Sequence, residues 1–308
     1  MCGMDSCSWD HFRSGAEAEG VVFLLSFSWI CASLVWYNTL IPLCVSGGGI
    51  LENPKDIRLM IRRGEWKGPT SGLALGYAQA NLVVIKKDFA YDFLLFAQRN
   101  PKPCPLLEVL DVGDPHTKMV ADGADVRTDI PLYRIYEGGR LVDEPSNILD
   151  YWSDDLVAFL LGCSFSFEYA LMDAGIPLRH VEAKRNVPMY VTNIETIPAG
   201  VLHGPLVVSM RPIPYDMVVR AVNITARFPF VHGAPVHVGY PELIGIDDLS
   251  KPDFGDPPVV KEGDVPVFWA CGVTPQAVAM VSGIDFMITH SPGHMFITDV
   301  KNTELSVF

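Results

Sequence analysis

The chain has 308 residues, of which 49% are hydrophobic and 19% are charged, and its formal net charge is −13 at pH 7. This composition can fill a sizeable core and excludes wholesale disorder. The negative charge and the lack of any lysine and arginine cluster argue against a nucleic-acid partner, because neutralising phosphates requires clustered basic residues.

Residues 1–52 differ from the rest of the chain. Within them, residues 21–45 hold no charged side chain, and this segment is long enough for a membrane helix of roughly 20 residues. The basic residues that follow would leave the main domain on the cytoplasmic side. Neither a secretory signal nor a mitochondrial transit peptide is favoured. The segment is either a membrane anchor or an alternative start without a role, and we expect the folded domain to span residues 53–308.

Local patterns predict most elements in the first half of this domain. Helices are expected at 57–63, 89–98 and 165–174, a short strand at 105–110, and a hairpin over 133–143 that turns at two adjacent glycines. The apolar run 156–161 fits either a strand or a buried helix, because periodicity cannot decide for so short a run. Residues 73–82 are ambiguous as well.

The second half is expected to contain three strands and two helices. The strands are 205–210, 265–270 and 286–289, and the helices are 215–227 and 274–282. Thr274 is the expected N-cap of the last helix, with Pro275 in its first turn. A strand, a helix and a strand in close succession indicate a βαβ unit, which implies a parallel strand pair. The predicted fold class is therefore α/β, with a mixed, partly parallel sheet.

Chemistry is expected beyond the carboxyl ends of these strands, where open α/β sheets bind ligands. Arg211 follows the first strand and offers a planar fork for a carboxylate. Cys271 and Gly272 follow the second strand, where the next helix would lower the pKa of the thiol below about 8.5. His290 and His294 follow the third and could move protons near neutral pH. Each residue has a structural explanation too, but their convergence on one edge favours a site.

Weaker candidates lie elsewhere in the chain. If 156–161 is a strand, Cys163 lies at a second strand-to-helix junction with Glu168 one turn further. Arg127 stands in apolar surroundings, as a substrate ligand or as part of a buried pair. His232 and His237 could bind a divalent metal together with the two histidines of the last loop, although the spacing selects no particular metal.

Nine segments of the domain resemble one family. They are GYAQANL (76–82), RNPKPCPLLEV (99–109), ADVRTDIPLYRIY (124–136), DDLVAFLLGCSFSFE (154–168), VPMYVTNI (187–194), VVSMRPIP (207–214), HGAPVHVG (232–239), PVFWACGVTPQ (266–276) and ITHSPGHMFITD (288–299). In this order, and over about residues 53–308, the chain resembles the hydro-lyase family that includes mitochondrial D-glutamate cyclase.

The resemblance implies a lyase that interconverts D-glutamate with 5-oxo-D-proline and water, built as two closely packed α/β subdomains. It also implies a mitochondrial matrix location, but no transit peptide is visible, so a cytoplasmic or membrane-anchored protein is the alternative. The animal cyclase continues into a second large domain that this sequence does not show. If catalysis resides in that domain, this chain would be inactive.

Cyclisation of glutamate needs carboxylate binding, oxyanion stabilisation and proton transfer. Arg211 is expected to bind a carboxylate, and Arg127 and His237 are further candidate substrate ligands. The backbone from Gly272 to Thr274 is expected to stabilise the oxyanion, and His290, His294 or Glu168 to transfer protons. Cys271 could form a transient thioester, but we favour an acid–base route because it needs no covalent step. No cofactor is required by this chemistry.

Two other functions remain open. The chain could be a non-catalytic module that binds a small carboxylate, or a metal-dependent hydrolase. The expected partner is in either case a small molecule, and a homo-oligomer is also possible. Contact with a membrane is expected only if residues 21–45 are a real anchor.

Overall fold

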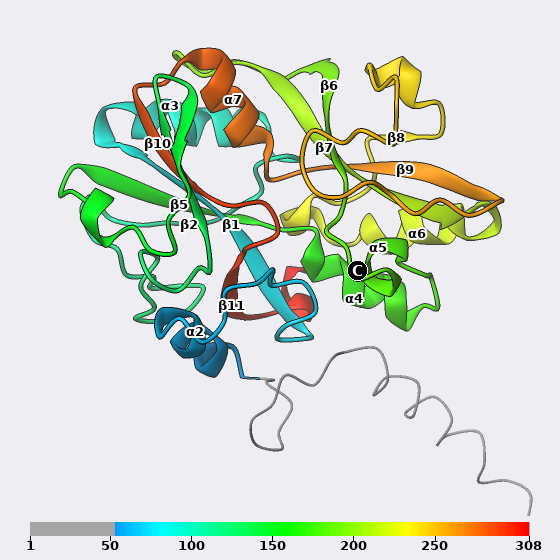
Figure 1. Cartoon of the computed structure of the whole chain (residues 1–308), viewed down its shortest axis with the longest axis horizontal. Coiled ribbons are helices and arrows are strands. Elements are labelled where there is room, and N and C mark those ends of the chain that lie inside the picture. Colours follow the sequence, from blue (N-terminus) through cyan, green and yellow to red (C-terminus); the bar gives the residue numbers. More distant parts are fainter. Residues whose placement is uncertain (1–52, 308) are drawn as a thin grey trace, which may run out of the picture. The chain divides into compact units, whose positions relative to one another are not determined.

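The computed structural model describes residues 53–307 of the chain (Figure 1). The apolar segment 21–45, with its membrane-anchor prediction, lies outside these residues. Among residues 53–307, no helix combines the length and the apolar character that crossing a membrane requires.

Most of the predicted elements are present. The helices are α2 (Pro54–Arg62), α3 (Lys87–Arg99), α4 (Phe165–Asp173), α5 (Arg179–Glu182), α6 (Val218–Thr225) and α7 (Thr274–Ser282). The strands are β1 (Tyr77–Lys86), β2 (Leu106–Val109), β3 (Tyr133–Glu137), β4 (Arg140–Asp143), β5 (Leu156–Gly162), β6 (Met189–Glu195), β7 (Pro205–Pro214), β8 (His237–Val238), β9 (Asp264–Ala270), β10 (Phe286–His290) and β11 (Phe296–Lys301). Both ambiguous runs are strands, since 156–161 lies in β5 and the end of 73–82 lies in β1.

Strand β1 is the centre of a seven-stranded sheet. The strand order is β2-β5-β1-β10-β3-β4, and β11 also pairs with β1. Leu82 and Val84 face one hydrophobic cluster, which is covered by the segment between β2 and β3. Val83 and Ile85 face a second cluster with α3 and α7. Because both faces are covered there, residues 82–85 of β1 are a continuous apolar run without alternation.

The other four strands form a second sheet, in the order β6-β7-β9-β8. Helices α4 and α6 cover one face of this sheet, where Phe167 packs near Trp269. The opposite face holds Val208, Met210 and Phe268 against apolar side chains of the segment before β9. Figure 1 shows the two sheets beside each other, with α7 leading from β9 of one sheet to β10 of the other.

The α/β class is confirmed, but the predicted parallel strand pairing is wrong. Every strand pair that the structure describes is antiparallel. Strands β9 and β10, which were expected to be parallel neighbours, belong to different sheets. The strand–helix–strand pattern reports only the order of elements along the chain. Strand partners depend on long-range hydrogen bonding, and β10 finds its partners in β1 and β3.

The prediction that Arg211 follows a strand is also wrong. Strand β7 continues through Arg211 and Pro212 to Pro214, with Arg211 opposite Val267 of β9. Strand β6 pairs with β7 only as far as Ser209. Beyond that point β7 is an edge strand on one side, where proline is tolerated because no ladder hydrogen bond is lost. Arg211 therefore lies within the four-stranded sheet and not at its carboxyl edge.

Candidate functional site

A buried polar cluster lies where α4 and α7 begin. We call it the junction cluster, and its members are Cys163, Glu168, His180, Arg211 and Cys271. Its position follows from the sequence, because β5 ends directly before Cys163 and β9 ends directly before Cys271. Both predicted strand-to-helix junctions are therefore real.

Arg211 is held by protein groups on all sides. Its Nε donates to Oε1 of Glu168 at 2.9 Å, and Nη2 donates to the same oxygen and to Ser164 Oγ at 2.9 Å. Nη1 donates to Ser209 Oγ at 3.1 Å, and the side chain is 0% exposed. This is the arrangement of a structural ion pair, and it leaves Arg211 little to offer a substrate carboxylate.

Glu168 is ionised in this environment. Burial alone would raise the pKa of its carboxyl group, but Arg211 and His180 outweigh burial and hold the pKa at about 2. His180 Nε2 lies 3.1 Å from Oε1 of Glu168, without the alignment of a hydrogen bond. A carboxyl group with so low a pKa is poorly matched to proton transfer near neutral pH. The geometry therefore favours a structural role for Glu168.

The two cysteine-containing turns meet at Asn81 of β1. Asn81 Nδ2 donates to the carbonyl oxygen of Gly162 at 2.8 Å. A Cβ atom added at Gly272 would lie only 2.0 Å from the same nitrogen, so any larger residue here would have to displace the Asn81 amide. Because Gly162 precedes Cys163 and Gly272 follows Cys271, the side chain of Asn81 lies between the two turns.

The prediction that helix α7 lowers the pKa of Cys271 is wrong. Burial raises the pKa of this thiol to about 11, although the N–H group of Val273 and the charge of Arg211 act in the opposite direction. Burial likewise raises the pKa of Cys163 to about 12. The cost of desolvating a thiolate exceeds what a helix N-terminus contributes here. Both thiols are therefore protonated at neutral pH.

This protonation state predicts slow alkylation. We expect iodoacetamide at pH 7.5 to modify Cys271 in the native chain roughly 100-fold more slowly than in the urea-unfolded chain, because only the thiolate reacts. Mass spectrometry of the peptide that contains Cys271 measures both rates. Equal rates in the two states would show that the thiol is neither buried nor raised in pKa.

His290 presents an unpartnered nitrogen in a buried place. Nδ1 of His290 lies 3.2 Å from the Leu82 nitrogen and 3.4 Å from the Leu82 carbonyl oxygen. The shorter contact is the hydrogen bond, in which the N–H group of Leu82 donates to Nδ1. The neutral ring therefore carries its proton on Nε2, and Nε2 has no hydrogen-bond partner among residues 53–307. Burial lowers the pKa of His290 to about 4. The expectation that His290 titrates near neutral pH is therefore wrong, and the ring is a neutral N–H donor.

His294 has a more open environment in the same loop. It is half-buried, and its Nδ1 lies 3.2 Å from the carbonyl oxygen of Pro292. Burial lowers the pKa of its imidazole from the ordinary value, while backbone carbonyl groups of the loop act in the opposite direction. Of the two predicted histidines, His294 is the better placed for proton transfer.

Buried histidines also make stability depend on pH. Burial lowers the pKa of His232 to about 4, as it does for His290. Both folded-state values lie below the unfolded value of about 6.5, so the unfolded chain binds more protons between about pH 6.5 and pH 4. We expect the free energy of unfolding to decrease as the pH is lowered from about 6.5 to 4, by on the order of 3 kcal/mol per imidazole. Urea unfolding between pH 7 and pH 4 measures this, and unchanged stability over that range would contradict it.

The remaining predicted residues at the junction are partly committed to other contacts. Thr274 is the first residue of α7, and Val273 takes the cap position that was predicted for Thr274. The Thr274 N–H group donates to the Cys271 carbonyl oxygen at 3.0 Å, so it is not free to hold an oxyanion. The N–H group of Gly272 donates to no described group. His237 lies in β8, with Nε2 3.0 Å from the carbonyl oxygen of Tyr240.

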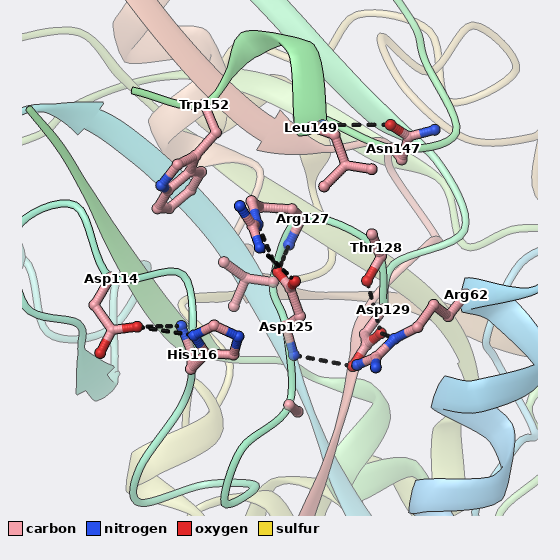
Figure 2. A network of polar contacts seen from close by, with 12 residues as sticks. Arg62, Asp114, His116, Asp125, Arg127, Thr128, Asp129, Asn147, Leu149 and Trp152 are labelled. Carbon is pink, nitrogen blue, oxygen red and sulfur yellow. Dashed lines mark hydrogen bonds and ion pairs between the residues drawn. The ribbon is translucent and has the colours of Figure 1, made fainter. Parts of the chain in front are cut away.

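Arg127 belongs to a separate network next to α2 (Figure 2). Its Nη2 donates to Oδ2 of Asp125 at 2.8 Å. The backbone of Asp125 donates in turn to Asp129, which is paired with Arg62 of α2 at 2.8 Å. None of these contacts reaches the junction cluster. Arg127 therefore orders the segment between β2 and β3, and the structure does not bring it to the other predicted site residues.

The predicted histidine metal site does not form. No group of three or more histidine, cysteine, aspartate or glutamate side chains within residues 53–307 is arranged to hold a metal ion. His232 is buried, and its Nδ1 lies 2.7 Å from the carbonyl oxygen of Lys102.

A cleft of about 450 Å³ borders that loop and was not predicted. Its lining includes Arg134, Tyr136, Asn186, Asp253, Phe254 and Ser291. Ser291 directly follows His290, and Phe254 packs against the hydrophobic cluster that contains Cys271. The cleft is therefore adjacent to the histidine loop, and Phe254 separates it from the hydrophobic cluster around Cys271. Arg134 was overlooked because it alternates with buried Tyr133 and Ile135, as the solvent-facing residue of a strand would.

Comparison with known proteins gives a consistent result. Residues 157–299 match the family model described as D-glutamate cyclase. A protein named "Putative hydro-lyase" from Thermoanaerobacter sp. (strain X514) is 66% identical over 253 residues, which cover 82% of this chain and 96% of that protein. A relative of the same description from Psychrobacter arcticus is 61% identical over 254 residues, covering 82% of this chain and 97% of the relative. A third, from Bacillus subtilis, is 59% identical over 254 residues, covering 82% and 99%.

These relatives are bacterial, so they lend no support to the mitochondrial location that the sequence resemblance implied. The coverage of each relative is nearly complete, and the identities are far above the level at which family membership is in question. The chain belongs to the hydro-lyase family that contains D-glutamate cyclase.

Proposed function

We propose that the chain interconverts D-glutamate with 5-oxo-D-proline and water. The observation that supports this most directly is the cleft, because it places the guanidinium group of Arg134 beside the loop of His290 and His294. Ser291 and Pro292 of this loop line the cleft, and a cationic anchor beside them suits a small carboxylate substrate that must lose protons and release water. Membership of the hydro-lyase family supports the same class of reaction.

The proposed reaction has two bond changes. The α-ammonium group gives up one proton, its nitrogen attacks the γ-carboxylate carbon to form the lactam C–N bond, and the nitrogen then loses a second proton. One γ-carboxyl oxygen takes up these two protons as its C–O bond breaks, and it leaves as water. Between the two steps the carbon is tetrahedral and carries an oxyanion, so the site must supply hydrogen-bond donors and a group that transfers protons.

His290 is the proposed oxyanion donor. Its Nε2–H is buried and unpartnered among the described residues, and its pKa of about 4 keeps the ring neutral at physiological pH. A neutral imidazole can donate a hydrogen bond to a developing oxyanion without first releasing a proton of its own. The N–H group of Gly272, which donates to no described group, is the proposed second donor.

His294 is the proposed proton carrier. It is half-buried, and its lowered pKa leaves the imidazole neutral and able to accept the proton of the α-amine. The same ring would pass each of the two protons in turn to the leaving oxygen. Cys271 has a protonated thiol and takes no covalent part in this scheme, which keeps the acid–base route that we favoured from the sequence.

Isotope labelling tests the proposed activity. The full chain is incubated with 5-oxo-D-proline in water enriched in oxygen-18, and glutamate is analysed by chiral chromatography and mass spectrometry. We expect D-glutamate with one labelled oxygen in its γ-carboxylate, while 5-oxo-L-proline serves as the stereochemical control. If the folded chain produces no glutamate and does not cyclise D-glutamate either, the proposal is wrong and a carboxylate-binding module becomes the better description.

A further inference from the structure

Arg134 presents a fixed and largely unused guanidinium fork to the cleft. Its Nε donates to Oε1 of Glu144 at 2.7 Å, and its guanidinium carbon lies 6.0 Å from the centre of the Phe254 ring. The hydrogen bond holds one edge of the guanidinium group, and the Phe254 ring lies against its face, so the two contacts together fix the orientation of the group. The guanidinium group also interacts with the Tyr136 hydroxyl group in the wall of the same cleft, and the Arg134 side chain is only 21% exposed. At least three of its four Nη N–H donors are therefore left for a ligand.

Asp253 contributes a carboxylate to the same cleft. Its Oδ2 accepts the N–H group of Val191 at 2.8 Å, which holds the side chain in place, and Oδ1 has no partner among the described residues. The other acidic group nearby, Glu144, is already bound to Arg134 and lies 3.4 Å from Ser291 Oγ. The cleft thus contains one cation with free donors and one anion with a free oxygen.

We infer that the cleft is an α-amino-acid site, in which Arg134 binds the α-carboxylate and Asp253 binds the α-ammonium group. A zwitterion matches this pair of unused groups, because the planar guanidinium suits a carboxylate and an aspartate oxygen suits an ammonium group. The identity of the amino acid as D-glutamate rests on the proposed function, but the recognition of a zwitterion does not.

The proposed site distinguishes the amino acid from its cyclised product. D-glutamate carries both charges, whereas the lactam nitrogen of 5-oxo-D-proline carries no positive charge. The product therefore keeps its contact with Arg134 and loses the contact with Asp253. Cyclisation would weaken binding at the ammonium end and so favour release of the product.

Three unreactive ligands test the inference on the full chain. D-norvaline has both charges, pentanoate lacks the amine, and butylamine lacks the carboxylate, and none of them can form a lactam. Ligand-observed NMR titrations give the dissociation constants. We expect D-norvaline to bind at least about tenfold more tightly than either partial ligand, as the gain of one charged hydrogen bond implies.

Two variants show which residue binds the carboxylate of the ligand and which binds its ammonium group. Arg134→Met should weaken D-norvaline and pentanoate by about 10- to 100-fold and leave butylamine unchanged. Asp253→Asn should weaken D-norvaline and butylamine by a similar factor and leave pentanoate unchanged. The matched controls are Arg140→Met, on the exposed strand β4, and Asp247→Asn, which is exposed and outside the cleft; both should bind all three ligands as the wild type does.

The binding experiments test the amino-acid site independently of the proposed activity. Wild-type chain that binds pentanoate as tightly as D-norvaline, or an Asp253→Asn variant that loses pentanoate to the same extent as D-norvaline, would overturn the inference even if D-glutamate is turned over. The expected variant pattern in a chain without turnover would support the amino-acid site and refute only the reaction.

Discussion

The Glu168→Gln variant is expected to unfold with a free energy about 3–5 kcal/mol lower than that of the wild type at pH 7. The substitution keeps the size of the side chain but removes the charge that balances Arg211, which is 0% exposed. An uncompensated guanidinium in a dry interior is costly, and its other partners are the neutral hydroxyl groups of Ser164 and Ser209. Urea unfolding of the two proteins measures the difference.

The dependence of this effect on pH has a definite sign. The folded pKa of Glu168, about 2, lies below its unfolded value, so the stabilisation is fully present above about pH 4.5. It is lost as the pH falls from there towards 2, and the difference between variant and wild type should shrink over that range.

Two further variants control for this result. Adding Arg211→Met to Glu168→Gln should recover part of the lost stability, because the unbalanced charge is removed. Arg63→Ala breaks a solvent-exposed pair with Glu65, whose side chains are 55% and 49% exposed, and it should leave the free energy of unfolding nearly unchanged. A loss below 1 kcal/mol for Glu168→Gln would show that the buried pair contributes little.

The His290→Asn variant is expected to have a kcat for the proposed reaction that is about 10²- to 10³-fold lower, with little change in KM. The side-chain oxygen of asparagine can still accept the N–H group of Leu82, as Nδ1 does at 3.2 Å. The variant lacks only the N–H group at the position of Nε2, which we propose as the oxyanion donor. Initial rates of D-glutamate cyclisation, together with circular dichroism to verify folding, measure this effect.

A histidine outside the site provides the comparison. His203 is exposed and contacts the carbonyl oxygen of Val201, so His203→Asn should keep wild-type rates. If folded His290→Asn retains more than a tenth of the wild-type kcat, His290 is not the oxyanion donor.

The local elements could be read from the sequence because their causes lie within a few residues. Gly138 and Gly139 have positive φ angles of 53° and 74°, which is what a two-residue hairpin turn requires, and the hairpin of β3 and β4 was predicted there. Helix α7 likewise begins within one residue of its predicted start, because proline in the first turn suits a helix N-terminus.

What the sequence determined by itself was therefore the order and type of most helices and of several strands, the family, and the presence of Cys271 and His290 at strand ends. Only the tertiary structure decided that all described pairs are antiparallel, that Arg211 is paired with Glu168 inside a strand, and that Arg134 faces a cleft. It also raised the pKa of Cys271 and lowered that of His290, in both cases through burial. Burial and strand pairing depend on residues far apart in the chain, such as Asn81 against Gly272, and a pattern within a short window holds no information about them.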